Sequence, residues 1–171
     1  MTKTSSKTTA VFLMGFIASG KDTQARLLKE KNGFLIISSN EIIKDNFKTN
    51  PDNKDVKLVK DQYYSGILIE PSIIAKWVVE DVRKKYKSGI SIVFSGSPRT
   101  LYEAENELPE IINFYGQDNV KLFFIDISEK EARKRNIMRN TLGGCGRKHV
   151  RVNVTYFIPF NLNEHKIYIL I

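Results

Sequence analysis

The sequence predicts an α/β domain in which helices flank a parallel sheet, and two observations support this fold class. First, short apolar runs typical of buried strands alternate with helical patterns from residue 10 to about residue 140. Second, three of these runs are nearly continuous in apolar residues, as expected for parallel strands covered on both faces. The four expected strands are 10–15, 34–37, 91–96 and 120–127.

The expected helices carry start or stop signals. The first helix, 21–31, ends at Asn32-Gly33, where glycine suits the left-handed conformation that closes a helix. Pro71 opens a later helix whose apolar residues share one face. Three other helices begin with a capping box, in which a hydroxyl residue is followed three places later by glutamate. These pairs are Ser38 with Glu41, Thr100 with Glu103, and Ser128 with Glu131.

The 171 residues, 1–171, are expected to form a single domain with one insertion. The core is expected over 10–38 and 89–140. Residues 39–88 hold only helical patterns, so we expect an all-helical insertion between the second and third strands. The chain has no internal repeat and no low-complexity linker.

The charge balance favours acidic partners. Lys and Arg exceed Asp and Glu by 27 to 19, which gives a formal net charge of +8 and suits a phosphorylated small molecule, a nucleic acid or an acidic membrane surface. No apolar run approaches the roughly 20 residues that span a bilayer, and no arginine-rich stripe carries interleaved aromatic residues. We therefore expect no membrane and no nucleic-acid partner. The lone cysteine, Cys145, excludes an internal disulfide and suits the cytoplasm.

The N-terminal region also allows a second interpretation, a secretion signal. Lys3 and Lys7 would form its charged region, residues 10–18 its apolar region, and the small residues ASG a cleavage zone. The apolar region has only nine residues and contains Gly15. Because this is short and interrupted for a signal, we prefer a phosphate-binding loop as the interpretation of the same stretch.

The stretch GFIASGKDTQ (15–24) has the spacing of a phosphate-binding loop. It follows an expected strand and opens an expected helix, where backbone amides and the helix dipole attract anions. Its two glycines and Lys21 match the pattern G-x-x-x-x-G-K, whose lysine reaches the outer phosphates. Asp22 stands where that pattern has serine or threonine, and the hydroxyl arrives one place later, at Thr23.

With its hydroxyl at this shifted position, the loop resembles that of the adenylate kinase family, which reads G-x-P-G-x-G-K-G-T-Q. Four later stretches resemble that family in the same order, so the resemblance covers about residues 10 to 140. ISSNEIIK (37–44) resembles I-S-T-G-D-L-L-R, SGILIEP (65–71) resembles S-G-x-L-V-P-D, FSGSPRT (94–100) resembles D-G-F-P-R-T, and RNIMR (135–139) resembles R-x-x-x-R. The resemblance implies a P-loop NTPase-like fold whose helical insertion binds a nucleoside monophosphate (NMP).

The resemblance further implies a cytoplasmic, monomeric kinase that transfers the γ-phosphate of ATP, bound with Mg²⁺, to an NMP, with AMP as the expected acceptor. The residues carried over for ATP are Gly15, Ala18, Ser19, Gly20, Lys21, Asp22, Thr23 and Arg135. Those carried over for the NMP are Ser39, Lys44, Leu68, Ile69, Gly96, Arg99 and Glu103. The expected catalytic residues are Lys21, Arg99, Arg135 and Arg139, and the hydroxyl of Thr23 is expected to assist Mg²⁺.

Several positions depart from the family pattern. Ser95 stands where the family has an aspartate that holds Mg²⁺ through water, so Asp22 or Asp126 would have to supply the carboxylate. Asp22 itself replaces a glycine. Glu103 replaces a glutamine that reads the acceptor base, and a carboxylate cannot donate as an amide does; the capping box alone also explains this glutamate. Arg135 lies among other basic residues, which also suits a solvated helix face.

Beyond residue 140 the resemblance weakens to an incomplete lid over 141–152. Some family members carry a zinc knuckle here, and Leu142 replaces its first cysteine. Tetrahedral zinc needs four ligands, which Cys145 and His149 cannot supply, so we expect no zinc site.

Residues 153–171 form a divergent tail, in which KIYILI (166–171) would add a fifth strand. Truncation or a shifted reading frame would produce such an end. Arg147 and Arg151 would be the lid arginines. Because lid closure excludes water and completes the charge clamp, the alternative hypothesis is a catalytically weak or truncated nucleotide-binding relative.

Overall fold

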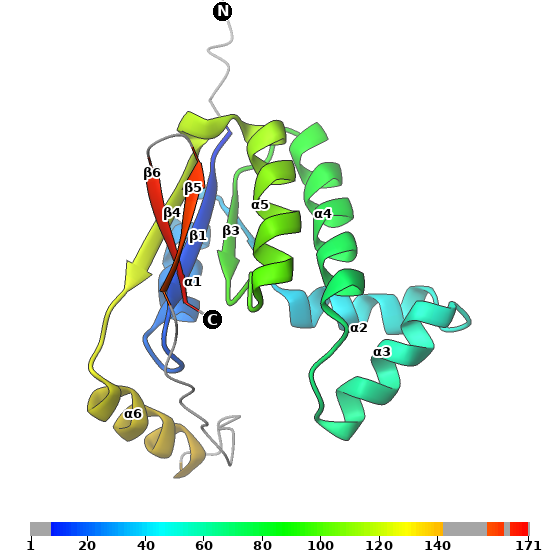
Figure 1. The fold of residues 1–171 in the computed structure, drawn as a ribbon, viewed down its shortest axis with the longest axis horizontal. Helices are drawn as coiled ribbons and strands as arrows, with labels where there is room; N and C mark the ends of the chain where they lie inside the picture. Colours follow the sequence, from blue (N-terminus) through cyan, green and yellow to red (C-terminus); the bar gives the residue numbers. More distant parts are fainter. Residues whose placement is uncertain (1–7, 142–156, 163–164, 171) are drawn as a thin grey trace, which may run out of the picture.

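The structure, a computed structural model, describes residues 8–141, 157–162 and 165–170 (Figure 1). Its central sheet has four parallel strands in the order β2-β3-β1-β4. The predicted fold class is therefore confirmed, and each predicted strand is present to within two residues at either end. The strands are β1 (Ala10–Gly15), β2 (Leu35–Ile37), β3 (Ile92–Ser95) and β4 (Val120–Ile125).

The predicted helix stop at Gly33, the start at Pro71 and the hydroxyl half of each capping box are confirmed. The hydroxyls of Ser38, Thr100 and Ser128 each accept a hydrogen bond from the amide three residues later. Gly33 closes the first helix with a left-handed φ of 72°. In the described ranges no helix is both long and apolar enough to cross a bilayer. These helices are α1 (Lys21–Asn32), α2 (Ser39–Thr49), α3 (Lys54–Ser65), α4 (Pro71–Lys87), α5 (Leu101–Tyr115), the 3-10 helix η1 (Gln117–Asn119) and α6 (Glu129–Thr141).

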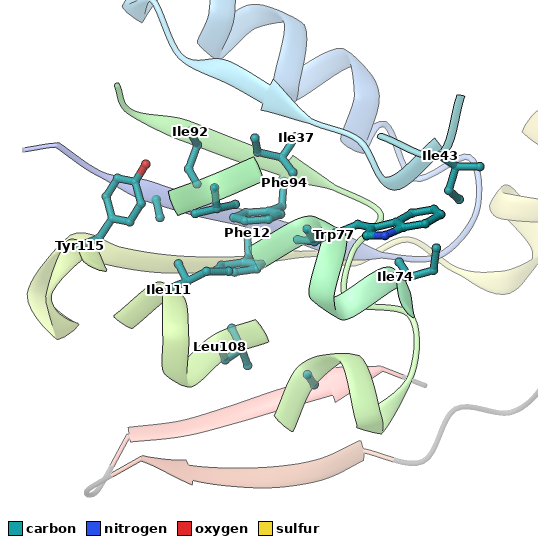
Figure 2. Close-up of a cluster of buried hydrophobic side chains, with 14 of the residues drawn as sticks. Phe12, Ile37, Ile43, Ile74, Trp77, Ile92, Phe94, Leu108, Ile111 and Tyr115 are labelled. Atoms are coloured by element: carbon teal, nitrogen blue, oxygen red, sulfur yellow. The ribbon is translucent and has the colours of Figure 1, made fainter. Parts of the chain in front are cut away.

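Helices cover both faces of the sheet, because successive strand residues point to opposite faces. Phe12 and Phe94 are strand neighbours whose stacked rings lie 4.2 Å apart, between centroids, on the face covered by α4 and α5. Leu108 of α5 belongs to the same core (Figure 2). Val11 and Val93 point to the opposite face, where they pack with residues of α1.

The two inner strands are more deeply buried than the two edge strands. β1 and β3 are buried along almost their whole length, as their continuous apolar runs predict. β4, at one edge, has alternating exposure along its first residues, and the side chain of Phe123 is 55% exposed. β2, at the other edge, is fully buried only at Ile37. Burial on both faces is thus confined to strands that have a neighbour on each side.

The predicted helical segment 39–88 contains α2, α3 and α4, and its helical character is confirmed. α2 and α3 form an arm that projects away from the sheet (Figure 1). α4 begins at Pro71 beside this arm but runs alongside α5, and its residues Val78 and Val82 are fully buried in the core. One helix of the insertion therefore belongs to the core by its packing.

The C-terminal strands form a hairpin of their own, in which β5 (Phe157–Leu162) pairs antiparallel with β6 (His165–Leu170). The hairpin lies on the α5 side of the central sheet, where β6 contacts β1 (Figures 1 and 2). A strand does form within 166–171, but it does not extend the parallel sheet as a fifth strand. Two residues join β5 to β6, and such a link permits only antiparallel neighbours, whereas parallel strands need a crossover of a dozen or more residues.

Candidate functional site

The candidate site lies at the carboxyl edge of the sheet, where two neighbouring strands end. Leu13 of β1 lies opposite Ser95 of β3 in the parallel register. The loop after β1 (15–20, the β1 loop) and the loop after β3 (96–100, the β3 loop) therefore begin side by side (Figure 1). Open α/β sheets bind ligands in the crevice outside the carboxyl ends of their strands.

The β1 loop folds back on itself in a conformation that requires glycine. Gly15 has a φ of +141°, and a Cβ at this position would lie 2.5 Å from the carbonyl oxygen of Ile125. The amide of Ser19 donates to the carbonyl of Phe16 at 3.2 Å. Gly20 follows with a φ of +101° and opens α1. The segment is a compact turn that delivers the chain into a helix, rather than an extended strand or a continuous helix.

Ala18 adopts an uncommon conformation in the middle of this loop. Its φ of +61° lies in the left-handed region, which costs an L-residue roughly 1–2 kcal/mol. The family pattern has glycine at this position. The chain therefore keeps the backbone conformation that glycine favours, although the residue is an alanine. Ala18 is buried, with 6% of its surface exposed.

The ammonium group of Lys21 lies over the β1 loop. Its Nζ donates to the carbonyl oxygens of Gly15 at 2.7 Å and Phe16 at 2.6 Å, and it lies 3.4 Å from Oγ of Ser19. α1 begins at the same turn, so its first backbone amides lie there as well. A positive charge and a helix N-terminus at one turn make an arrangement that attracts phosphate.

Asp22 and Ser95 meet at the mouth of the β1 loop. Ser95, the last residue of β3, donates from Oγ to Oδ1 of Asp22 at 2.5 Å, although the two residues are 73 apart in the sequence. The Asp22 side chain is exposed, and within the described ranges it forms no ion pair. Of the two carboxylates proposed to replace the missing aspartate, the structure brings Asp22 to Ser95.

The β3 loop is fixed from behind by two buried glutamates of α5. The backbone amide of Arg99 donates to Oε2 of Glu103 at 2.7 Å, and Oγ of Ser97 donates to Oε2 of Glu107 at 2.9 Å. Glu103 is 4% exposed and Glu107 is fully buried. Nε of Arg99 donates to the carbonyl of Gly96 at 2.8 Å. This places the exposed guanidinium over its own loop.

Burial perturbs both carboxyl groups. It raises the pKa of Glu107 to about 8, with a further contribution from the charge of Glu103, while the hydrogen bond from Ser97 opposes the shift. Burial also raises the pKa of Glu103, against the hydrogen bond from the Arg99 amide and the Arg99 charge. Oε1 of Glu107 has no hydrogen-bond partner within the described ranges. Glu107 therefore carries a proton at neutral pH.

Sequence reasoning found Glu103 but missed Glu107 and Ser97. Thr100 caps the amide of Glu103, so the hydroxyl half of the predicted capping box forms. The carboxylate of Glu103, however, accepts from Arg99 rather than from the cap residue. The missed signal was the spacing: Glu107 lies four residues after Glu103 and immediately before Leu108, on the buried face of α5.

The residues predicted for the NMP lie on several elements. Ser39, at the start of α2, is buried, and its hydroxyl has no hydrogen-bond partner among the described residues. Lys44 lines a hollow of about 380 Å³ between α2 and α4, and Arg99 is not part of its lining. The structure therefore does not bring Lys44 and Arg99 together in that hollow. Its other lining residues are Ile36, Ser38, Glu41, Ile42, Asp45, Lys48, Asp81 and Lys85.

The segment between α3 and α4 carries the other predicted NMP residues. Leu68 is 71% exposed, and the neighbouring Ile67 is 59% exposed. Ile69 instead packs partly against the core. Gln62 of α3 holds this segment, because its Oε1 accepts from the amide of Glu70 at 2.9 Å.

The predicted phosphate-clamping arginines belong to α6. Nε of Arg135 donates to Oε1 of Glu131 at 2.7 Å, one turn earlier on an exposed helix face, and this bond lowers the pKa of Glu131. Arg139 lies in α6, but its side chain is outside the described part of the structure. The predicted lid positions, which are Leu142, Cys145, Arg147, His149 and Arg151, lie outside the described residues as well.

The donor atoms at the β1 loop suit a hard cation rather than a soft one. Among the described residues, no group of three or more His, Cys, Asp or Glu side chains could hold a metal alone. Asp22 and Ser95 instead bring one carboxylate and one hydroxyl oxygen together, and the exposed Thr23 follows Asp22 in α1. Mg²⁺ takes oxygen ligands, keeps several waters and is usually held by one or two carboxylates together with substrate phosphates. The residues present therefore fit Mg²⁺ bound together with a nucleotide.

Comparisons with known proteins point to one kind of enzyme. The chain is 30% identical to an adenylate kinase of Prochlorococcus marinus (strain MIT 9301) over 129 residues, which cover 75% of this chain and 68% of that protein. It is 27% identical to an adenylate kinase of Parabacteroides distasonis over 134 residues, 78% of this chain and 68% of the relative. An adenylate kinase of Caldicellulosiruptor bescii is 26% identical over 136 residues, 80% and 61% of the two chains. No family model matches.

Proposed function

The chain belongs to the adenylate kinase family, and on that premise we propose that it transfers the γ-phosphate of ATP to a nucleoside monophosphate. The observation that carries the proposal is the β1 loop, a glycine turn with the Lys21 ammonium laid over its carbonyls at the N-terminus of a helix. Phosphoryl transfer asks a protein mainly to align two substrates and to surround the migrating group with positive charge. This loop supplies that charge at the sheet edge.

The ATP phosphates would be bound by the β1 loop. Its amides and the N-terminus of α1 would donate to the phosphate oxygens, and the Lys21 ammonium would leave the carbonyls of Gly15 and Phe16 for the outer phosphates. Mg²⁺ bound with ATP would supply charge neutralisation at the phosphate oxygens. Thr23 and Asp22 are the residues that would hold it through oxygen.

The acceptor would be bound by the β3 loop and the exposed segment before α4. Arg99 has the planar, doubly donating group that grips a phosphate in two places, and Glu103 fixes its backbone. Leu68 is exposed beside the helical arm, and an acceptor base would pack against it. We propose AMP as the acceptor, in line with the activity named for the relatives.

A coupled assay with ATP and each of AMP, GMP, CMP and UMP tests this function. We expect turnover with one monophosphate, preferentially AMP. Lys21→Ala should lower kcat/KM by about 10²–10³-fold, because the charge that stabilises the transferred group is lost. Lys29→Ala, which removes an exposed lysine from the last turn of the same helix, should leave it unchanged. Equal activity in the two variants would contradict the proposal.

A second candidate function is nucleotide binding with little or no transfer. The observation that favours it is Ser95, a hydroxyl where the family pattern has a carboxylate. This candidate predicts micromolar or tighter ATP binding together with undetectable turnover for all four acceptors. Turnover that is lost in Lys21→Ala would reject it.

A further inference from the structure

We propose that Asp22 is the carboxylate that receives the Mg²⁺ of bound Mg·ATP, and that Ser95 acts as the positioning residue that aims it. The proposal rests on the proposed nucleotide site. It assigns to this chain an exchange of two residues: the carboxylate has left the end of β3 and has reappeared in the first turn of α1, where the family pattern has glycine. The role at the metal would be preserved by position in space rather than by position in the sequence.

The geometry brings the two exchanged positions into direct contact. Oγ of Ser95 donates to Oδ1 of Asp22 at 2.5 Å. The Asp22 carboxylate is therefore held at the end of β3, the position where the family pattern has an aspartate. The register of β3 on β1 fixes Ser95, because Leu13 lies opposite it just before the β1 loop begins. The start of α1 fixes Asp22 at the same place, one residue after Lys21. The second oxygen of Asp22 remains for an outside ligand, since no hydrogen bond to it occurs within the described residues.

The other candidate carboxylate lies further away. Asp126 follows β4, and β1 separates β4 from β3 in the sheet. An aspartate after β4 is therefore on the far side of the β1 loop from Ser95. Nothing in the described part of the chain ties its side chain to Ser95, whereas Asp22 is bonded to it.

The charges at the loop mouth favour a cation beside Asp22 when a nucleotide phosphate is bound there. The carboxylate of Asp22 stands beside a turn that presents a lysine and helix amides to phosphate, and within the described ranges it has no cationic partner. Two anions this close repel each other unless a cation lies between them. A lone carboxylate here would weaken the binding of free ATP, but would strengthen the binding of ATP that carries Mg²⁺.

A purely structural role for Asp22 makes a different prediction. An acidic residue in the first turn of a helix stabilises it by roughly 0.3–1 kcal/mol through the helix dipole. That role would be lost on neutralisation without any change in how Mg²⁺ affects nucleotide binding. Measurements of binding with and without the metal therefore separate the two roles.

The test is the dissociation constant of ATP, measured by calorimetry with excess Mg²⁺ and again with EDTA. The wild-type chain should bind ATP more tightly with Mg²⁺. Asp22→Asn keeps an oxygen that accepts from Ser95 but removes the charge, so it should bind free ATP more tightly and lower the Mg²⁺ enhancement by about tenfold. Asp118→Asn is the control. Asp118 lies in η1, which precedes β4 at the amino end of the sheet, away from the loops that follow the strands. This substitution should leave the enhancement unchanged.

A double substitution sharpens the test. Asp22→Gly should lose the enhancement, and Asp22→Gly combined with Ser95→Asp should restore it, because the carboxylate returns to the end of β3. An enhancement that is the same in Asp22→Asn as in the wild type would overturn the proposal, as would a double variant that melts like the wild type yet shows no recovery. If the wild type bound no ATP in either condition, the proposed function itself would fail, which is a distinct result.

Discussion

The two loops at the carboxyl edge of the sheet are neighbours, yet they are held in place by different means. The β1 loop is shaped by its main chain, through glycines with positive φ and a lysine that donates to loop carbonyls. The β3 loop is held from behind by two buried carboxyl groups of α5. The difference teaches that the first loop is sensitive to added volume, whereas the second is sensitive to protonation and to lost hydrogen bonds.

The largest expected effect is an added methyl group in the β1 loop. Gly15→Ala should lower the free energy of unfolding by about 4 kcal/mol, the range of the most damaging single substitutions, because its Cβ would meet the β4 backbone at 2.5 Å. Gly33→Ala is the matched control, since that glycine also has a positive φ but faces open space; it should cost about 1 kcal/mol. Urea unfolding compares the two. Equal losses would show that backbone conformation alone, and not close approach, shapes the loop.

The second effect concerns pH and belongs to the β3 loop. The folded chain keeps a proton on Glu107 between its ordinary pKa of 4.5 and its raised pKa of about 8, whereas the unfolded chain has released it. Stability should therefore fall as pH rises through this window, by up to about 1.4 kcal/mol per pH unit. Glu107→Gln should flatten much of this slope in unfolding curves taken from pH 5 to pH 8. A wild-type slope that the substitution leaves intact would assign the effect to another group.

The third effect separates acceptor binding from donor binding. Glu103→Ala removes the acceptor of the Arg99 amide, so the β3 loop should loosen and the KM for the monophosphate should rise about tenfold, the equivalent of one buried hydrogen bond. The dissociation constant of ATP should not change, because the β1 loop is held by its own main chain. Glu105→Ala, exposed on the same helix, serves as the control. Parallel losses for both substrates would show that the two loops are coupled.

The smallest effect is the relief of strain at the centre of the β1 loop. Ala18→Gly removes a left-handed alanine, a gain of roughly 1–2 kcal/mol, but adds the chain entropy of a glycine, a cost of roughly 0.5–1 kcal/mol. Thermal unfolding should show a change within about 1 kcal/mol, on the stabilising side. A clear loss of stability would mean that the buried methyl group contributes packing that outweighs its strain.

Most of the fold could be predicted from the sequence because its signals are local. Strand limits followed from short apolar runs, and helix starts followed from hydroxyl caps such as Ser38 and Thr100, which act over three residues. The C-terminal hairpin was not foreseen, since its pairing depends on the two-residue link between β5 and β6 rather than on the strand-like pattern of 166–171.

The site was less predictable, because its contacts join distant parts of the chain. The glycine turn and Lys21 lie within seven residues, and their spacing indicated a phosphate loop. The bond between Asp22 and Ser95 depends on the order of the strands, so the sequence left Asp22 and Asp126 as equal alternatives. Glu107 was overlooked because a glutamate on a helix is ordinarily solvated, and only the packing of α5 shows that this one is buried.

α4 belongs to the helical insertion by sequence and to the core by packing, and this affects how the chain could be altered. The helix is a stiff rod of about 25 Å at 1.5 Å per residue, with Val78 and Val82 locked among the core side chains and its other end attached to the exposed Leu68 segment. Substitutions in the core that change the angle of α4 would therefore also move the Leu68 segment that precedes it. Substitutions meant to retune the proposed acceptor site should therefore leave the buried face of α4 unchanged and vary only the exposed residues of the Leu68 segment.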